Sequence, residues 1–343
     1  MSNQIGSLKK GKCTVTTVQS RVAPEVLVKI FTVASKIKLY DETYRAALRA
    51  GTIGGMYYSP RGQEIIPASF AAVLRPDDYV LTTYRGVHDQ IAKGMPLPTL
   101  TAEFFGRASG SCKGKGGPMH VTDVASGLIL TTGVVGSGLP IAVGVGLSAQ
   151  LRKSGQVAVV NFGDGASNIG AFHEALNMAS LWQLPVVFTC QNNQYAEYTR
   201  YRHGTSVDQV AMRGASYTMR SIHVDGNDPQ AMYEAASTAV DAARAGQGPT
   251  LIEAMTYRFH GHVMGDSMSY MPKEELGAAR DADPVLRMRA ELIASGALSE
   301  EQATTIEDGL RQEIDAAFEY AVSQPLPDAA DGLTDVYAEG VAL

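Results

Sequence analysis

The sequence predicts an α/β protein with a doubly wound, mostly parallel sheet. Continuous apolar and β-branched runs at 157–162, 185–190 and 250–254 indicate buried strands. A run with helical spacing over 168–182 separates the first two, and strand, helix, strand with continuous apolar strands is typical of parallel pairing. The 343 residues, of which 45% are hydrophobic, suffice to bury a core on both faces of such a sheet.

The N-terminal half predicts a long helix followed by a first strand. Pro24 suits the first turn of a helix, and apolar residues recur at helical spacing until Gly51 ends it. A strand is predicted over 78–84, followed by a helix that ends at Gly94. We expect a disordered arm over residues 1–23, a single domain over 24–322 and a C-terminal tail over 323–343.

The remaining segments alternate between loop and helix. The loop from Ser109 to Pro118 is rich in glycine and lysine, which suits an anionic ligand, although a solvated turn has the same composition. A short strand at 222–224 precedes a helix that starts at Pro229, and charged helices are predicted from 273 to about 322.

Composition excludes several classes of protein. A net charge of −6 gives no overall basic footprint for nucleic acid. The uncharged run over 124–151 is interrupted by glycines and Pro140, so it predicts strand, loop and helix in place of a membrane span. The three cysteines, Cys13, Cys112 and Cys190, lie far apart, which fits a reducing compartment. We expect a bacterial-type cytoplasm, with the mitochondrial matrix less favoured.

Two short polar motifs follow neighbouring predicted strands. Gly163-Asp164-Gly165 ends one strand and Asn192-Asn193 ends the next, and the carboxyl ends of parallel strands meet at one edge of a sheet. Carboxylate and amide oxygens are ligands for Mg²⁺, which also takes phosphate oxygens. Gly165 lets the backbone approach phosphates, and N–H groups near Ala166 at the start of the following helix face the anion. The pair therefore predicts a Mg²⁺-diphosphate site.

Each motif alone has a simpler interpretation. Gly-Asp-Gly is also an ordinary turn, and Asn-Asn is also a helix cap. A dinucleotide-binding fingerprint needs a third glycine where this chain has Asn168, and no P-loop is present in the sequence. The combination at strand ends with this spacing favours the diphosphate interpretation.

These residues and their flanks resemble the alpha subunit of the thiamine diphosphate-dependent first component of 2-oxo acid and acetoin dehydrogenase complexes. The resemblance covers roughly Val26 to Glu339. Besides the two motifs, it is carried by Gly62-Gln63-Glu64, Thr83-Tyr84-Arg85-Gly86, Lys113 to His120, Gly133-Val134-Val135-Gly136, Glu174 to Ala179, and Tyr257 to His262.

The resemblance implies roles for individual residues. The metal would be held by Asp164, Asn193 and the Tyr195 carbonyl. The diphosphate would be bound by Tyr84 and Arg85, with Gly165 and Ala166 beside it, and the aminopyrimidine ring by Gly133 and Val135. His262 and His120 would line the entrance and act in catalysis, although a lone histidine is also commonly a structural group.

The resemblance also implies the activity and the partners. The complex would cleave a pyruvate-like 2-oxo acid or acetoin and transfer the acyl group to a lipoyl carrier on an acyltransferase core. A separate beta subunit would carry the pyrimidine-binding domain and the catalytic glutamate, giving an α2β2 assembly. Gly138, Ala142 and Gly146 share one helical face, which suits subunit packing or internal packing equally.

Several alternatives remain open at this stage. The identity of the substrate stays open, because Tyr58 stands where many relatives of the family have histidine. The stretch over 192–199 is more similar to acetoin-type relatives, and branched-chain 2-oxo acids are a further alternative. A non-catalytic stabilising subunit would share the assembly but not the cofactor. A self-sufficient thiamine enzyme needs a second α/β domain, for which the length leaves no room. A nucleotide-binding oxidoreductase is disfavoured by the missing third glycine.

Overall fold

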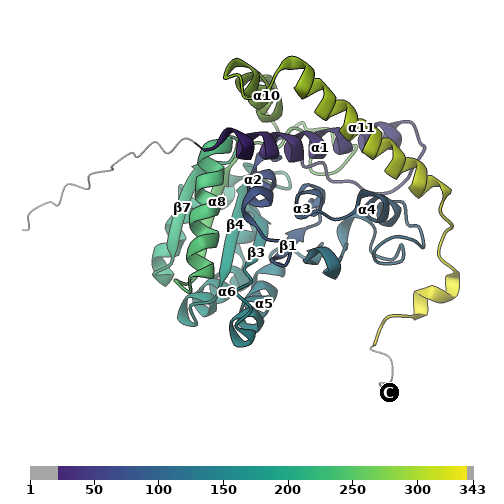
Figure 1. Cartoon of the computed structure of the whole chain (residues 1–343). Helices are drawn as coiled ribbons and strands as arrows, with labels where there is room; N and C mark the ends of the chain where they lie inside the picture. The colour runs from purple at the N-terminus through teal and green to yellow at the C-terminus, as the bar shows by residue number, and fades with distance from the viewer. Residues whose placement is uncertain (1–21, 338–343) are drawn as a thin grey trace, which may run out of the picture.

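A six-stranded parallel sheet forms the centre of the protein, and the computed structural model describes residues 22–337 (Figure 1). The strand order is β2-β1-β3-β4-β8-β7, and every neighbouring pair is parallel. The predicted fold class is therefore confirmed. The strands are β1 (Tyr79–Thr83), β2 (Leu128–Thr132), β3 (Ala158–Gly163), β4 (Val186–Asn192), β7 (Arg220–Asp225) and β8 (Thr250–Met255).

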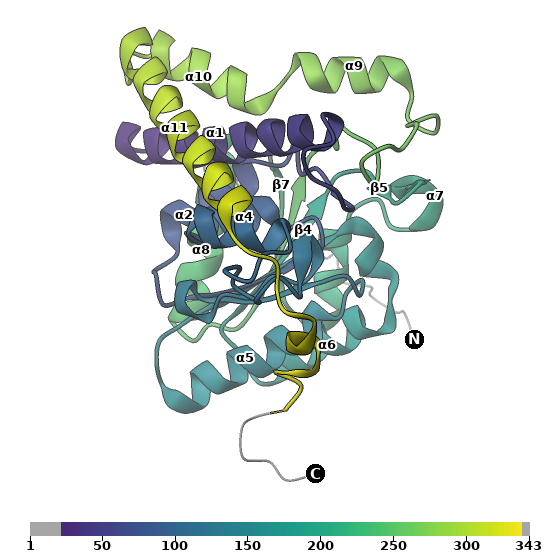
Figure 2. The same cartoon turned by 90° about the vertical axis from the view of Figure 1, so that its right-hand side faces the viewer.

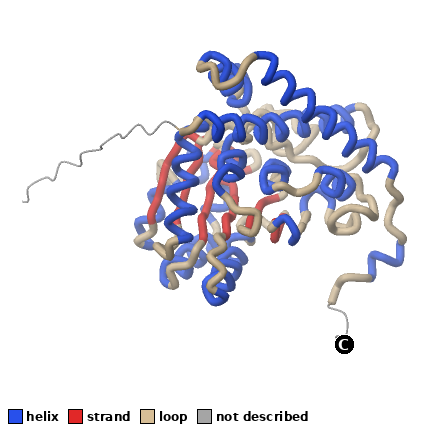
Figure 3. The backbone as a smooth tube through the Cα atoms, viewed as in Figure 1, coloured by secondary structure: helices blue, strands red, loops and turns tan. Residues whose placement is uncertain are grey.

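Helices cover both faces of the sheet, as the tube drawing shows (Figure 3). One face carries α2 (Ile65–Val73), α3 (Val87–Lys93) and α8 (Pro229–Arg244), with α1 (Pro24–Arg49) across them. The other face carries α5 (Gly138–Arg152) and α6 (Gly170–Leu181). The remaining helices are α4 (Leu97–Phe104), α7 (Tyr201–Gly204), α9 (Lys273–Asp281), α10 (Pro284–Ala294) and α11 (Glu300–Ser323), and α11 crosses α1 and α4 (Figure 2).

The sheet separates two hydrophobic cores. Val159 and Val187 belong to the core under α1, α2, α3 and α8. Their neighbours Val160 and Phe188 point to the opposite face and belong to the core under α5 and α6. Because both faces are buried, the central strands are continuously apolar, which is the signal that made them predictable.

The segment after β3 differs from the prediction. A 3-10 helix, η3 (Asp164–Asn168), follows the strand directly, and α6 begins only at Gly170. Ile169 between them has an extended backbone, with φ −90° and ψ 157°, so the two helices are separate. The N–H groups of Ala166 and Ser167 therefore belong to a 3-10 turn, and the predicted α-helix start at this position is wrong.

The uncharged run over 124–151 folds as strand, loop and helix. It comprises η2 (Val124–Ser126), β2 and α5. Over the residues that the structure describes, no helix combines the length and apolarity required to cross a membrane. The predicted arm over 1–23 lies outside the described residues except for its last two, and the end of the predicted tail, 338–343, lies outside them too.

The small residues of α5 serve internal packing. Gly138 and Ala142 are buried under the sheet, and a Cβ added at Gly146 would lie 2.5 Å from a methyl of Val186 in β4. The predicted alternative, close packing of these three positions against another subunit, is therefore wrong. The outward face of α5 carries other residues, among them the exposed Ile141 and Leu151.

Asp78 ties three elements together at the amino ends of the strands. Its carboxylate accepts the backbone N–H of Arg75 at 2.8 Å and of Val157 at 2.9 Å, and both terminal nitrogens of Arg244 at 3.0 and 2.7 Å. Burial raises the pKa of this carboxyl, but the hydrogen bonds from Arg244 and the two amides outweigh it and leave the pKa below its usual value.

Replacing Asp78 with asparagine is expected to lower the free energy of unfolding by about 2–3 kcal/mol, because Arg244 and two amides lose a charged acceptor. Urea denaturation measures this directly. Asp77→Asn is the matched control, because Asp77 is exposed and its ion pair with Arg75 is worth less than about 1 kcal/mol. Folding lowers the pKa of Asp78, so its ionised carboxylate adds to the free energy of unfolding above pH about 3.9. This stabilisation is lost as the pH falls through the folded pKa. Equal effects of the two substitutions would contradict this assignment.

Candidate functional site

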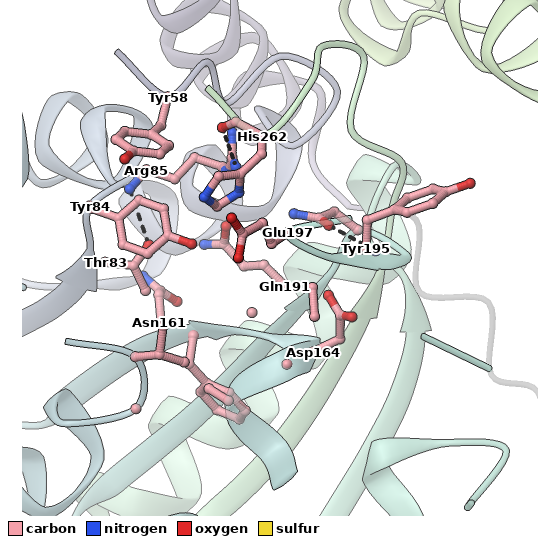
Figure 4. A pocket seen from close by; sticks show the side chains of 18 of the residues that line it. Tyr58, Thr83, Tyr84, Arg85, Asn161, Asp164, Gln191, Tyr195, Glu197 and His262 are labelled. Carbon is pink, nitrogen blue, oxygen red and sulfur yellow. Dashed lines mark hydrogen bonds between the residues drawn. The ribbon is translucent and has the colours of Figure 1, made fainter. Parts of the chain in front are cut away.

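A cavity of about 390 Å³ opens at the carboxyl ends of β1, β3 and β4, where a parallel sheet is expected to bind ligands (Figure 4). Ten of the residues predicted from the sequence line it: Tyr84, Arg85, Gly133, Val135, Asp164, Gly165, Ala166, Asn193, Tyr195 and His262. The fold thus brings these residues together from segments far apart in the sequence. Their individual roles stay predictions.

His120 is the one predicted site residue that does not line the cavity. It is exposed, and its ring lies beside Gly133, since a Cβ added at Gly133 would be 3.4–3.5 Å from the imidazole. The neighbouring Met119 does line the cavity. His120 therefore stands at the rim, one residue away from the wall.

Asp164 provides a buried carboxylate at the end of β3. Its Oδ2 atom finds no hydrogen-bond partner within the described chain. Burial raises the pKa of Asp164 to about 7, and the positive charges of Arg258 and Arg85 only partly oppose this rise. A bound cation would stabilise the ionised form, so this orphaned oxygen fits a divalent metal ion.

Asn193 presents an amide oxygen whose orientation is fixed. Its Nδ2 donates to Oε1 of Gln63 at 2.7 Å. Its Oδ1 accepts the backbone N–H of Tyr195 at 3.2 Å, in the turn that leads into the hairpin of β5 (Tyr195–Ala196) and β6 (Thr199–Arg200). A carbonyl oxygen has two lone pairs, so Oδ1 keeps one for a further partner. Asp164 and Asn193 together fit Mg²⁺, whereas the described residues contain no cluster of three or more His, Cys, Asp or Glu side chains for a metal.

Gly165 is required by packing as well as by the predicted close approach of phosphate. A Cβ at this position would lie only 2.7 Å from the Cβ of Ala196 in β5. Neighbouring Asn192 points away from the cavity, because its Nδ2 donates to the buried carboxylate of Glu253 at 2.7 Å. Of the Asn-Asn pair, Asn193 alone belongs to the cavity wall.

Two buried arginines make the cavity suitable for an anion. Arg85 donates to the carbonyl oxygens of Ser59 at 2.8 Å and of His262 at 3.0 Å, and Arg258 donates to the carbonyl of Glu197 at 2.9 Å. Burial, together with the charge of Arg258, lowers the pKa of Arg85 to about 10, so it is still protonated at neutral pH. Each guanidinium has five N–H donors, so both retain donors for a ligand.

Aromatic rings form the wall opposite Asp164 (Figure 4). Tyr58 and Tyr84 meet edge to face with centroids 4.6 Å apart, and the His262 ring lies 5.2 Å from Tyr58 and 5.8 Å from Tyr84. This part of the wall is therefore aromatic, and the Arg85 guanidinium lies 5.8 Å from the centroid of the Tyr58 ring.

Asp266 and Tyr270 hold the loop that carries His262. The Asp266 carboxylate accepts the backbone N–H of His262 at 2.6 Å and the hydroxyl of Tyr270 at 2.7 Å, and Arg258 donates to the same hydroxyl at 2.7 Å. This network links the loop to a cavity arginine. Arg258 and the backbone of His262 therefore share the partners Asp266 and Tyr270.

Gln63, Glu197 and Arg258 are among the lining residues for which the sequence predicted no role. A signal for Arg258 was present, since it follows the end of β8 by three residues and lies at the same edge of the sheet as Asp164. Glu197 has a backbone φ of +53°, which the sequence does not predict. Gln63 acts through Asn193, a contact between segments 130 residues apart.

The Gly- and Lys-rich loop over 109–118 already binds an anion from the same chain, the carboxylate of Glu103. Four of its backbone N–H groups bind the buried carboxylate of Glu103 in α4. Its two lysines, Lys113 and Lys115, bind Asp335 near the C-terminus at 2.9 and 2.7 Å. The suggestion that this loop binds an anionic ligand is therefore wrong for the donors that Glu103 occupies.

His262 is expected to remain neutral throughout the physiological range. Burial, with the neighbouring Arg85 and Arg258, lowers the pKa of His262 to about 4. We expect an NMR titration of its imidazole to show a midpoint near 4, with His260→Asn used to assign the signal. Because the folded pKa lies below the ordinary 6.5, the unfolded chain binds more protons between these values, so this group weakens the fold as the pH falls below 6.5. A midpoint near 6.5 would contradict the assignment.

The sequence model of the family described as "Dehydrogenase E1 component" matches residues 36–330, which is most of the chain. The alpha subunit of acetoin:2,6-dichlorophenolindophenol oxidoreductase from Bacillus subtilis is 37% identical over 88% of this chain and 90% of the relative. The corresponding subunit from Cupriavidus necator is 35% identical over 91% and 94%. The pyruvate dehydrogenase E1 component subunit alpha of Rhizobium meliloti is 34% identical over 88% and 86%.

Proposed function

The chain belongs to the dehydrogenase E1 component family, as the alpha subunit of a 2-oxo acid or acetoin dehydrogenase, an oxidoreductase, and from this we propose that it binds thiamine diphosphate and Mg²⁺ in the cavity at the strand ends. The observation that carries the proposal is the orphaned carboxylate of Asp164 facing two buried arginines across one cavity. That pairing suits a metal ion together with the phosphates it binds.

In this proposal each side of the cavity has one task. Asp164, Asn193 and the Tyr195 carbonyl hold Mg²⁺, and Tyr84, Arg85 and Arg258 bind the phosphate oxygens. Bound thiamine diphosphate supplies the carbanion chemistry that breaks the carbon–carbon bond beside the substrate carbonyl. The protein binds and orients the cofactor and excludes water from it. Neutral His262 is available at the entrance to accept a proton at Nδ1, which has no partner among the described residues.

A beta subunit is the proposed partner, and exposed apolar residues support it. Val134 and Val135 beside the cavity are 66% and 50% exposed. Further exposed apolar side chains lie on or next to α5 and α6: Ile141, Leu151, Leu181 and Trp182. Exposed apolar side chains on two neighbouring helices favour burial against another protein. We propose an α2β2 assembly in which the beta subunit completes the site and supplies the catalytic glutamate.

Acetoin is the first substrate to test, with pyruvate and branched-chain 2-oxo acids as the alternatives. The two acetoin relatives are 37% and 35% identical to this chain, and the pyruvate relative is 34% identical. The complete proposal includes transfer of the acyl group to a lipoyl-bearing acyltransferase and a cytoplasmic location. The non-catalytic alternative predicts assembly without cofactor binding.

Ligand-dependent thermal stability tests the proposed function. We expect thiamine diphosphate with Mg²⁺ to raise the melting temperature of the assembled protein, and a chelator to reverse the effect, because Asp164 and Asn193 reach the phosphates through the ion. NAD serves as the control ligand. Stabilisation by NAD and not by thiamine diphosphate would replace the proposal with a nucleotide-binding function.

A further inference from the structure

Glu103 lies near the end of α4 with its side chain completely buried. Its Oε2 accepts the backbone N–H of Cys112 at 2.8 Å and of Gly114 at 2.9 Å. Its Oε1 accepts those of Gly116 at 2.8 Å and Gly117 at 3.0 Å. One carboxylate thus receives four backbone donors from a single loop.

This pattern requires a carboxylate. An ionised carboxylate has about four lone-pair sites and no donor, so four N–H groups saturate Glu103. A glutamine at the same position would offer one oxygen, and its NH₂ group would face two of the four loop donors. The loop would then contain unsatisfied N–H groups in a buried place, which a carboxylate avoids.

The loop sequence is adapted to this anion. Lys113, Gly114 and Gly117 have φ values of 59°, 76° and 55°, and such left-handed residues turn successive N–H groups toward one point. A Cβ added at Gly110 would lie 2.4 Å from Oε2 of Glu103, and one added at Gly116 would lie 2.5 Å from the carbonyl oxygen of His120. The glycines therefore serve the approach of the loop to an internal carboxylate.

The same loop ends at the rim of the cavity. The Sγ atom of Cys112 accepts the N–H of Thr122 at 3.3 Å and lies 3.6 Å from the carbonyl oxygen of His120. Cys112, whose amide binds Glu103, thus contacts His120 itself and Thr122 two residues later. Met119 in that segment lines the cavity beside Gly133.

We propose that Glu103 is a positioning residue that holds Met119 and His120 at the entrance of the cavity through the backbone of the 112–117 loop. The chemical role of His120 in this inference rests on the proposed function. The order of the loop rests on the contacts of Glu103 alone. The two parts are tested separately.

The order of the loop is measured in the assembled protein by amide hydrogen exchange and by alkylation of Cys112, followed by mass spectrometry. In the wild type we expect the amides of Cys112, Gly114, Gly116 and Gly117 to be protected although they lie in a loop. In Glu103→Gln we expect exchange and alkylation to be about tenfold faster or more. Unprotected amides in the wild type would overturn the proposal even if the variant does not fold.

Asp335→Asn is the matched control, because Asp335 binds the same loop from outside through Lys113 and Lys115. It removes one carboxylate charge, as Glu103→Gln does, but leaves the four backbone hydrogen bonds in place. We expect its loop exchange and its activity to match the wild type. Equal effects of the two variants would show that the internal carboxylate is not what orders the loop.

A double-mutant cycle separates positioning from a merely structural role. We expect Glu103→Gln to lower kcat/KM by about tenfold to hundredfold, as misplaced groups do, while the Mg²⁺ dependence of cofactor binding, which rests on Asp164 and Asn193, stays unchanged. In a His120→Asn background the same change should cost less than about twofold. An equal loss in both backgrounds would overturn the proposal. If the wild type has no dehydrogenase activity, the proposed function fails, and the exchange data still decide the role of Glu103 in the loop.

Discussion

Replacing Asp164 with asparagine is expected to abolish Mg²⁺-dependent cofactor binding while the fold and the subunit assembly persist. The carboxylate is buried, and its Oδ2 atom has no partner in the described structure, so a bound cation is the group that completes its surroundings. Asparagine has nearly the same shape but no charge to offset the dehydration of the ion. We expect the affinity for thiamine diphosphate to fall by about a hundredfold or more, which corresponds to about 2.8 kcal/mol.

Titration calorimetry with thiamine diphosphate in excess Mg²⁺ measures this loss, and native mass spectrometry checks the assembly. Asp308→Asn is a suitable control, because its exposed carboxylate lies on α11 and makes only a surface ion pair with Arg311. An Asp164→Asn variant that retains full affinity would refute the proposed metal site. Absence of cofactor binding in the wild-type assembly would instead favour the non-catalytic subunit.

The isolated chain is expected to show no dehydrogenase turnover above background. Among its described residues, the carboxylates that line the cavity are Asp164 and Glu197, and Asp164 is assigned to the metal. A positioned general acid or base contributes about a hundredfold to ten-thousandfold to a rate, and in this proposal that group comes from the beta subunit. Adding the beta subunit should therefore raise turnover by at least that factor.

Reconstitution from separately purified subunits tests this expectation, with acetoin and 2-oxo acids as substrates and an artificial electron acceptor to report turnover. The partner is identified by copurification with the tagged chain. Turnover by the isolated chain would contradict the two-subunit proposal. Its loss in Glu197→Gln would then identify Glu197 as the group that replaces the partner's glutamate.

The sequence predicted the parts of this protein that depend on local pattern. The central strands were predictable because they are apolar on both faces, and Asp164 and Asn193 were predictable because chain order places both at strand ends. The family resemblance then supplied Tyr84, Arg85, Gly133 and Val135, which the structure places in one cavity.

What the sequence did not predict depends on contacts between distant segments. Glycines and lysines at 109–118 suggested an external anion, because nothing local shows that Glu103 reaches the loop from α4. The three small residues of α5 were equally compatible with packing against another subunit and with packing inside the chain. Their spacing does not show that β4 lies beneath them. The start of α6 was misplaced because Ile169, an ordinary helix residue by composition, is extended in its tertiary setting.

The order of strands in the sheet has a consequence for how the chain is made. β1 lies between β2 and β3, and the contact between Asp78 and Val157 at their amino ends joins residues 79 positions apart. At about 5–20 residues per second, a ribosome needs on the order of 4–16 seconds to translate that interval. During this time the edge of β1 that later pairs with β3 has no partner strand. The nascent chain therefore passes through a stage at which β1 is open to incorrect strand pairing.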